Sequence, residues 1–210
     1  MTTRTLRDSS YERLSRRTQL KLDTFTVFDA EWTSIQHDDG HAFAVGAVHM
    51  NMQGDILAHF QGRCPIESRP SIFVAEHVMP AVRNMEKTHA SQHMLRNDFW
   101  MWLREYGIPV FADMGSFADG PFLHLCIRDD LGARALRGIP FPLHEVATLL
   151  IAAGTDMNIS RIAYAKKTGL LQAKFIRGMG EHHPLFDAYV SGLCVIQAIR
   201  EISGHKDKKQ

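Results

Sequence analysis

The sequence has few of the features that mark membrane, secreted or strongly nucleic-acid-binding proteins. No apolar run approaches the roughly 20 residues that a membrane-spanning helix needs. The 24 basic residues nearly balance the 23 acidic ones, and the net charge of +1 gives no global attraction to nucleic acid. Any surface for such a partner must therefore be local. Neither internal repeats nor low-complexity tracts are present, so we expect a soluble globular protein.

Cysteine is also scarce. The three cysteines, Cys64, Cys126 and Cys194, are odd in number, far apart and without a CxxC pair. This pattern excludes a disulfide framework and gives no zinc-binding spacing. A reducing compartment fits it best, and we expect a cytoplasmic location with no membrane partner.

The 210 residues are enough for one domain with a full hydrophobic core. Residues 1–22 are polar and rich in arginine and lack a secretory apolar core, so we interpret them as a basic arm or short helix. Residues 204–210 are expected to form a flexible tail. Between them, residues 23–203 are predicted to fold as a single domain.

Hydrophobic periodicity predicts an α/β fold. Buried-looking strands at residues 24–30, 41–50 and 55–63, joined by short turns, predict an antiparallel meander, with a tight turn around Gly54. The later pattern is mostly helical, and a fourth strand is expected at 108–112 and a fifth, edge-type strand at 139–143. Helices are predicted at 91–106, from about 117, at 144–153, at 158–168 and at 184–202.

The first candidate site is the stretch FTVFDAEWTS, in which an apolar strand runs into Asp29 and Glu31. Residues two apart on a strand project from the same face. Two adjacent carboxylates repel and resist burial unless a cation lies between them, and hard oxygen ligands suit Mg²⁺ or Mn²⁺. The alternative is a strand end that simply reaches solvent.

The second candidate is GEHHPLFDAYVSG, where His182 precedes Asp187 by five positions. Pro184 is well placed at the first turn of a helix, which puts the imidazole on a loop and the aspartate on rigid backbone. The alternative is that Asp187 is a favourable charge near a helix N-terminus and the histidines are surface residues.

The third candidate is VFADMGSFADGPFL, where Asp119 lies in a turn that opens a helix. Asp113 is a nearby competitor for the same role. Helix capping by either aspartate is the alternative.

Together these segments resemble the DEDDh 3′–5′ exonucleases of the RNase H-like fold, over roughly residues 24–200. The aromatic residue after Glu31 is similar to the RNase T-like exoribonuclease branch. HHPLFDA matches the family's HxAxxDA, with Pro184 where alanine is usual. The middle motif departs further, because Gly115 replaces the usual asparagine and the aromatic, Phe117, comes one position early.

The resemblance implies a mixed five-stranded sheet flanked by helices and a site with two Mg²⁺ or Mn²⁺ ions. Asp29, Glu31, Asp119 and Asp187 would be the metal ligands, and His182 the general base. The five-residue spacing to Asp187 favours His182 over its neighbour His183. The implied activity is hydrolysis from the 3′ end of single-stranded RNA or DNA, with RNA favoured, releasing nucleoside 5′-monophosphates. Related enzymes often form homodimers.

Trp32 follows Glu31, so it could stack on a terminal base or pack in the core. A basic stretch could contact backbone phosphates or be a solvated surface; it comprises Arg161, Lys166, Lys167, Lys174 and Arg177. The competing functions are a non-catalytic nucleic-acid-binding or scaffold protein of the same fold, a DNA-directed proofreading-type exonuclease, and a nucleotide phosphatase.

Overall fold

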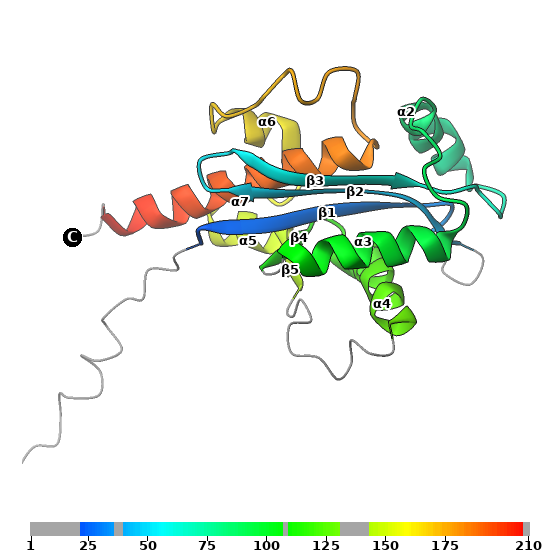
Figure 1. The fold of residues 1–210 in the computed structure, drawn as a ribbon. Helices are drawn as coiled ribbons and strands as arrows, with labels where there is room; N and C mark the ends of the chain where they lie inside the picture. The colour runs from blue at the N-terminus through cyan, green and yellow to red at the C-terminus, as the bar shows by residue number, and fades with distance from the viewer. Residues whose placement is uncertain (1–21, 36–39, 107–108, 131–142, 208–210) are drawn as a thin grey trace, which may run out of the picture.

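A computed structural model describes residues 22–35, 40–106, 109–130 and 143–207. A mixed five-stranded sheet in the order β3-β2-β1-β4-β5 forms the centre of the molecule (Figure 1). The predicted meander is confirmed, with β1 (Thr24–Trp32), β2 (Ala42–Asn51) and β3 (Ile56–Arg63) paired antiparallel. The arm expected over residues 1–22 lies, apart from its last residue, outside the described residues.

The turn between β2 and β3 follows the prediction at Gly54. This glycine has a φ of 88°, in the left-handed region that favours glycine. Asn51 fixes the turn, because its side-chain oxygen accepts hydrogen bonds from the N–H groups of Gln53 and Asp55. The short connection keeps β3 at the edge of the sheet, next to β2.

β4 (Val110–Ala112) and β5 (Leu143–Glu145) complete the sheet in parallel to β1. Of the strand predicted at 139–143, only Leu143 lies within the described residues, where it belongs to β5; residues 139–142 lie outside them. Proline has no N–H to donate to a sheet, and β5 starts directly after Pro142.

Helices cover both faces of the sheet (Figure 1). Alternate residues of β1 face α3 (Gln92–Tyr106) and α4 (Gly120–Asp129), where Phe28 packs against Phe99 and Phe122. The α3 prediction is confirmed. The intervening residues, such as Val27, join a second core with the helices of the other face, α5 (Val146–Ala152), α6 (Arg161–Lys166) and α7 (Pro184–Asp207).

Three helical segments differ in detail from the prediction. The helix expected near residue 117 begins as a π-helical turn, η2 (Gly115–Asp119), which leads into α4. α7 continues to Asp207, four residues into the segment expected to be a tail. The helical region after residue 71 consists of η1 (Val74–Val78) and α2 (Met79–Val82).

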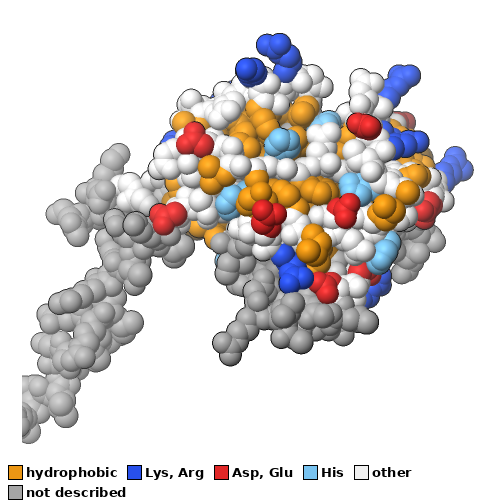
Figure 2. Space-filling view, in the orientation of Figure 1, with side chains coloured by type: hydrophobic (Ala, Val, Ile, Leu, Met, Phe, Trp, Pro, Cys, Tyr) orange, Lys and Arg blue, Asp and Glu red, His pale blue; other side chains and the backbone are white. Residues whose placement is uncertain are grey.

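The surface and the cysteines agree with the composition. Figure 2 shows acidic, basic and histidine side chains mixed with apolar ones on the α3 side, as expected from the near-zero net charge. Cys64, Cys126 and Cys194 are free and buried. Within the described ranges, no helix is both long and apolar enough to cross a bilayer.

Candidate metal centre

β1 presents Asp29 and Glu31 on the side of the sheet that α7 covers. They alternate with Phe28 and Ala30, which pack in the core on the α3 side. Asp29 pairs in register with Gly46 of β2. The predicted orientation of the two acids toward one face therefore agrees with the fold.

Gly46 allows α7 to lie directly on the sheet at this point. A Cβ atom on Gly46 would lie 2.2 Å from the backbone nitrogen of Leu185, a distance that no real side chain tolerates. Any other residue here would push the first turn of α7 away from β2. The close approach brings Asp187, in that first turn, to the face that carries Asp29 and Glu31.

Three of the predicted residues form a group with the geometry of a cation site. Ligand atoms of Glu31, His182 and Asp187 all lie within 4.8 Å of one another. They come from two segments about 150 positions apart in the sequence, and only the docking of α7 brings them together.

Asp119 joins the cluster from the end of η2 and is fully buried. Its Oδ1 accepts a hydrogen bond from the N–H of Ala30 at 2.9 Å, and its Oδ2 accepts one from the N–H of Met114 at 3.0 Å. The carboxylate thus fastens η2 to the middle of β1, between the two acids of that strand.

The electrostatics of the four carboxyls are those of an unneutralised acidic cluster. Burial is the main cause that raises the pKa of Asp29 and Glu31 well above the ordinary value, and the neighbouring carboxylates raise it further. Burial also raises the pKa of Asp119 and of Asp187 to about 7, although backbone N–H bonds oppose the shift in both. Asp29 Oδ2 is buried without a hydrogen-bond partner among the described residues. An orphaned acceptor among crowded acids fits a divalent cation.

His182 has an unusual backbone for a non-glycine residue, with a φ of 66°. In this conformation its N–H donates to Asp187 Oδ2 at 2.8 Å, which ties the loop to the acid of α7. Its neighbour His183 is 6% exposed, with Nδ1 lacking a partner in the described structure and a pKa lowered by burial. The geometry therefore separates the two histidines and places His182 at the acids.

Trp32 lies away from the acids. It is 6% exposed, belongs to the core on the α3 side, and its Nε1 donates to the carbonyl of Ala118 at 3.1 Å. This packing agrees with the core alternative, although Trp32 also contributes to the wall of a cavity. Base stacking by Trp32 stays a prediction.

Phe73 is a residue that the sequence interpretation missed. It is 57% exposed and its ring packs edge-on to His182, with ring centroids 5.6 Å apart. His77 lies beside both rings, 4.8 Å from Phe73 and 6.4 Å from His182. An apolar run after Pro70 was the signal, but nothing in the local pattern indicated that one ring would stay exposed.

An ion pair behind the acids was also missed. Arg161 Nε lies 2.9 Å and 3.2 Å from the two oxygens of Asp113, and Arg161 Nη1 donates to the carbonyl of Met157 at 2.8 Å. Ala112, the last residue of β4, pairs with Phe28 of β1. Asp113 and Asp29 are the residues that directly follow these two partners. Arg161 is therefore engaged with a fifth carboxylate, and is not the free phosphate contact that its basic neighbourhood allowed.

Comparisons with solved structures identify the fold. Exonuclease I from Methylocaldum szegediense superposes with a TM-score of 0.55 at 12% identity, over 85% of this chain and 40% of that one. The nuclease domain of 3′hExo, a DEDDh family member bound to rAMP, gives a TM-score of 0.53 at 16% identity, over 87% of this chain and 92% of that domain. The chain has the RNase H-like fold of these nucleases.

This likeness in fold is not accompanied by close sequence similarity. No protein-family model matches the sequence, and no curated protein sequence matches it. The chain spans less than half of the Exonuclease I chain but nearly all of the 3′hExo nuclease domain. The predicted RNase H-like fold is therefore confirmed by structural similarity and not by similarity in sequence.

Proposed function

We propose that this protein is a DEDDh-type 3′–5′ exonuclease that removes nucleoside 5′-monophosphates from single-stranded nucleic acid. The observation that carries the proposal is the convergence of four acids around the C-terminal half of β1, the central strand of the sheet. A surface that only bound phosphates would gain nothing from clustered carboxylates, because like charges repel. RNA is the favoured substrate, on the likeness of the Glu31–Trp32 pair to RNase T-like exoribonucleases.

The residues fit divalent cations of the Mg²⁺ or Mn²⁺ class. Asp29, Glu31 and Asp187 would hold one ion, and Asp29 with Asp119 would hold a second. Because both oxygens of Asp119 already accept backbone N–H bonds, it would contribute through remaining lone pairs or through water. When bound, such ions lower the pKa of water and stabilise the charge on the attacking and leaving oxygens.

His182 is assigned the role of general base. A neutral imidazole can accept a proton from an attacking water at a ring nitrogen. The bond from its N–H to Asp187 fixes the loop, so that the ring stays at the acids. Phe73, exposed against this ring, offers an apolar face for the terminal base, and such stacking contributes about 1–3 kcal/mol.

The decisive experiment replaces Asp29 with asparagine, which keeps the size of the side chain and removes its charge. Purified wild-type protein with Mn²⁺ should trim a 5′-labelled single-stranded oligonucleotide stepwise. Asp29→Asn should lower the trimming rate by more than about 100-fold. A residue that only hydrogen-bonds to a metal ligand typically costs about 10- to 100-fold when it is replaced. Asp23→Asn, an exposed acid just before the same strand, is the matched control and should trim normally.

Matched RNA and DNA oligonucleotides in the same assay test the substrate preference, because contacts to the 2′-OH distinguish the two. Faster trimming of DNA would reverse the RNA assignment while leaving the nuclease in place. If metal-loaded wild-type protein leaves both polymers intact, the exonuclease proposal fails and the non-catalytic binding protein takes its place.

A further inference from the structure

A cavity of about 760 Å³ lies on the opposite side of β1 from the acids. Its volume is within the roughly 300–1,000 Å³ of ordinary ligand sites. Its lining includes polar, charged and aromatic side chains, among them Trp32, His41, Arg96, Ser116, His124 and Arg128. Gly115 and Ser116, the first residues of η2, also belong to its wall, so one turn separates the cavity from Asp119.

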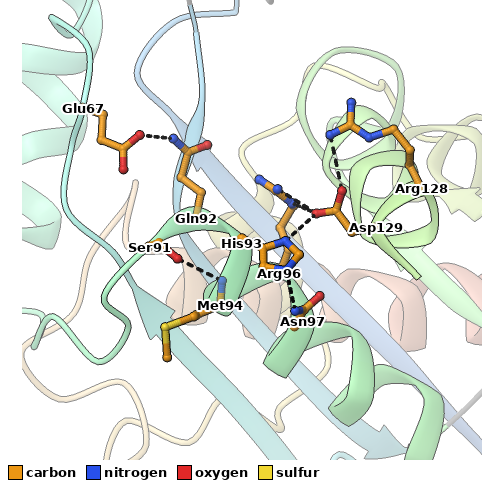
Figure 3. Close-up of polar contacts among 9 residues, drawn as sticks. All are labelled: Glu67, Ser91, Gln92, His93, Met94, Arg96, Asn97, Arg128 and Asp129. Carbon is orange, nitrogen blue, oxygen red and sulfur yellow. Dashed lines mark hydrogen bonds and ion pairs between the residues drawn. The ribbon is translucent and has the colours of Figure 1, made fainter. Parts of the chain in front are cut away.

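The Asp, Glu, Lys and Arg side chains that line the cavity are two arginines, Arg96 and Arg128. Figure 3 shows His93, Arg96 and Arg128 converging on the carboxylate of Asp129. Arg96 contacts Asp129 Oδ2 with Nε at 2.7 Å and Nη2 at 2.6 Å, whereas Arg128 reaches Oδ1 with Nη2 at 3.3 Å. Within this group one carboxylate faces two guanidinium groups, which leaves one positive charge. Glu67 and Glu145 accept hydrogen bonds from the lining residues Gln92 and Ser116, but neither carboxylate belongs to the cavity wall.

The two arginines differ in how firmly they are held. The side chain of Arg96 is 12% exposed and that of Asp129 is 9% exposed, so this largely buried pair tethers α3 to the end of α4. The side chain of Arg128 is 54% exposed. Its other N–H groups have no partner among the described residues. The tether does not require Arg128, whose donors are available to an anion.

We propose that this cavity is a second subsite, which binds a backbone phosphate of the nucleic-acid strand upstream of the terminal nucleotide, with Arg128 as the main contact. The proposal rests on the proposed exonuclease function. A strand whose 3′ end lies at the acids can cross η2 to reach the cavity, since both sites border that turn. Arg96, held by Asp129, reinforces the positive potential, and guanidinium groups suit phosphate oxygens.

The test measures how strongly a 5′-labelled eight-nucleotide strand binds as KCl is raised. Binding is followed by fluorescence anisotropy in a Glu31→Gln background with Mg²⁺, so that the strand is not trimmed. Arg128→Gln should weaken binding roughly fivefold at low salt. The slope of log K against log salt should become shallower by about 0.7, the value for one lost phosphate contact on a single strand.

Two further variants separate the subsite from a general charge effect. Arg104→Gln removes an arginine of α3 that pairs with Asp130 at 2.9 Å, outside the cavity wall, and should leave the slope unchanged. Arg128→Lys retains the charge and should restore most of the slope. If Arg128→Gln and Arg104→Gln behave alike, or if lysine does not rescue, the subsite does not exist. Thermal melting of each variant shows whether the fold is intact.

A kinetic comparison with the trimming-competent protein distinguishes this proposal from the exonuclease proposal. Arg128→Gln should raise the KM for the eight-nucleotide strand with little change in kcat, and leave cleavage of a dinucleotide unchanged. Equal effects on both lengths would place Arg128 at the terminal nucleotide and overturn the upstream assignment. The two proposals can also fail separately. If the wild-type protein trims nothing but Arg128→Gln still weakens salt-dependent binding, the phosphate subsite stands and only the exonuclease proposal is refuted.

Discussion

At the scale of single residues, the least expected feature is a fifth carboxylate beside the acidic cluster. After burial, which is the main cause, Asp113 also helps to raise the pKa of Asp29, Asp119 and Asp187. Arg161 neutralises Asp113 and is itself held by loop carbonyls. The pair therefore sets the charge that a cation would meet at the site.

Replacing Arg161 with glutamine should strengthen Mn²⁺ binding by roughly three- to tenfold, because an unpaired Asp113 adds negative potential at short range. Asp113→Asn should weaken binding by leaving an unpaired cation near the acids. Isothermal titration calorimetry of the two variants and their double mutant forms a thermodynamic cycle. If the pair acts through its charge, the double mutant should bind Mn²⁺ with nearly the wild-type affinity. A double mutant whose Mn²⁺ affinity differs from wild type as much as that of a single variant would contradict this.

At the scale of elements, the site depends on how closely α7 approaches β2. Two glycines make the crossing possible. Gly46 admits the backbone of Leu185, and Gly192, two turns along α7, admits the flexible side chain of Met50. Gly46 lies within the strand predicted at 41–50, but the element that packs against it was not apparent from the strand alone.

Gly46→Ala should lower the free energy of unfolding by about 1–3 kcal/mol, the usual cost of overpacking, and displace Asp187 from Asp29. Urea denaturation measures the stability, and Mn²⁺ titration measures the site. Gly204→Ala, near the other end of α7 where a Cβ meets nothing within 4 Å, is the control and should be neutral or slightly stabilising. Wild-type stability and metal binding in Gly46→Ala would refute the close-approach argument.

At the scale of the whole molecule, folding concentrates carboxyls that the unfolded chain would keep apart in water. All four acids titrate at higher pH in the folded, metal-free protein than in the unfolded chain. Between the ordinary carboxyl pKa of about 4 and those raised values the folded state binds more protons, so its stability falls as the pH rises through that range. Metal binding displaces those protons and should be tighter at higher pH.

The metal-free protein should therefore have a lower melting temperature at pH 8 than at pH 6.5, by a few degrees or more. Buried histidines, whose pKa is lowered by burial, oppose this trend only below about pH 6.5. Mg²⁺ or Mn²⁺ should raise the melting temperature more at pH 8 than at pH 6.5. A double variant, Asp29→Asn with Glu31→Gln, should lose most of the pH effect. A melting temperature that rises between pH 6.5 and pH 8 in metal-free wild type would contradict the acidic cluster.

The sequence by itself determined the parts of the fold that depend on local chemistry. Short apolar runs and the turn at Gly54 predicted the meander, Pro184 predicted the start of α7, and side-chain alternation placed Asp29 and Glu31 on one face. β5 runs to Glu145, beyond the end predicted at residue 143, because so short a segment beside prolines carries too little pattern to define the end of a strand.

Only the tertiary structure decided which distant residues meet. Spacing along the chain pointed to both Asp119 and Asp113, but the backbone N–H groups of Ala30 and Met114 bind the first, while Arg161 binds the second. Neither the exposure of Phe73 nor the arginine-lined cavity could be predicted, because each depends on gaps left between elements that pack together. Secondary structure depends mainly on residues that are neighbours in the sequence. The burial of a side chain, its charge environment and its hydrogen-bond partners depend on residues that become neighbours only when the chain folds.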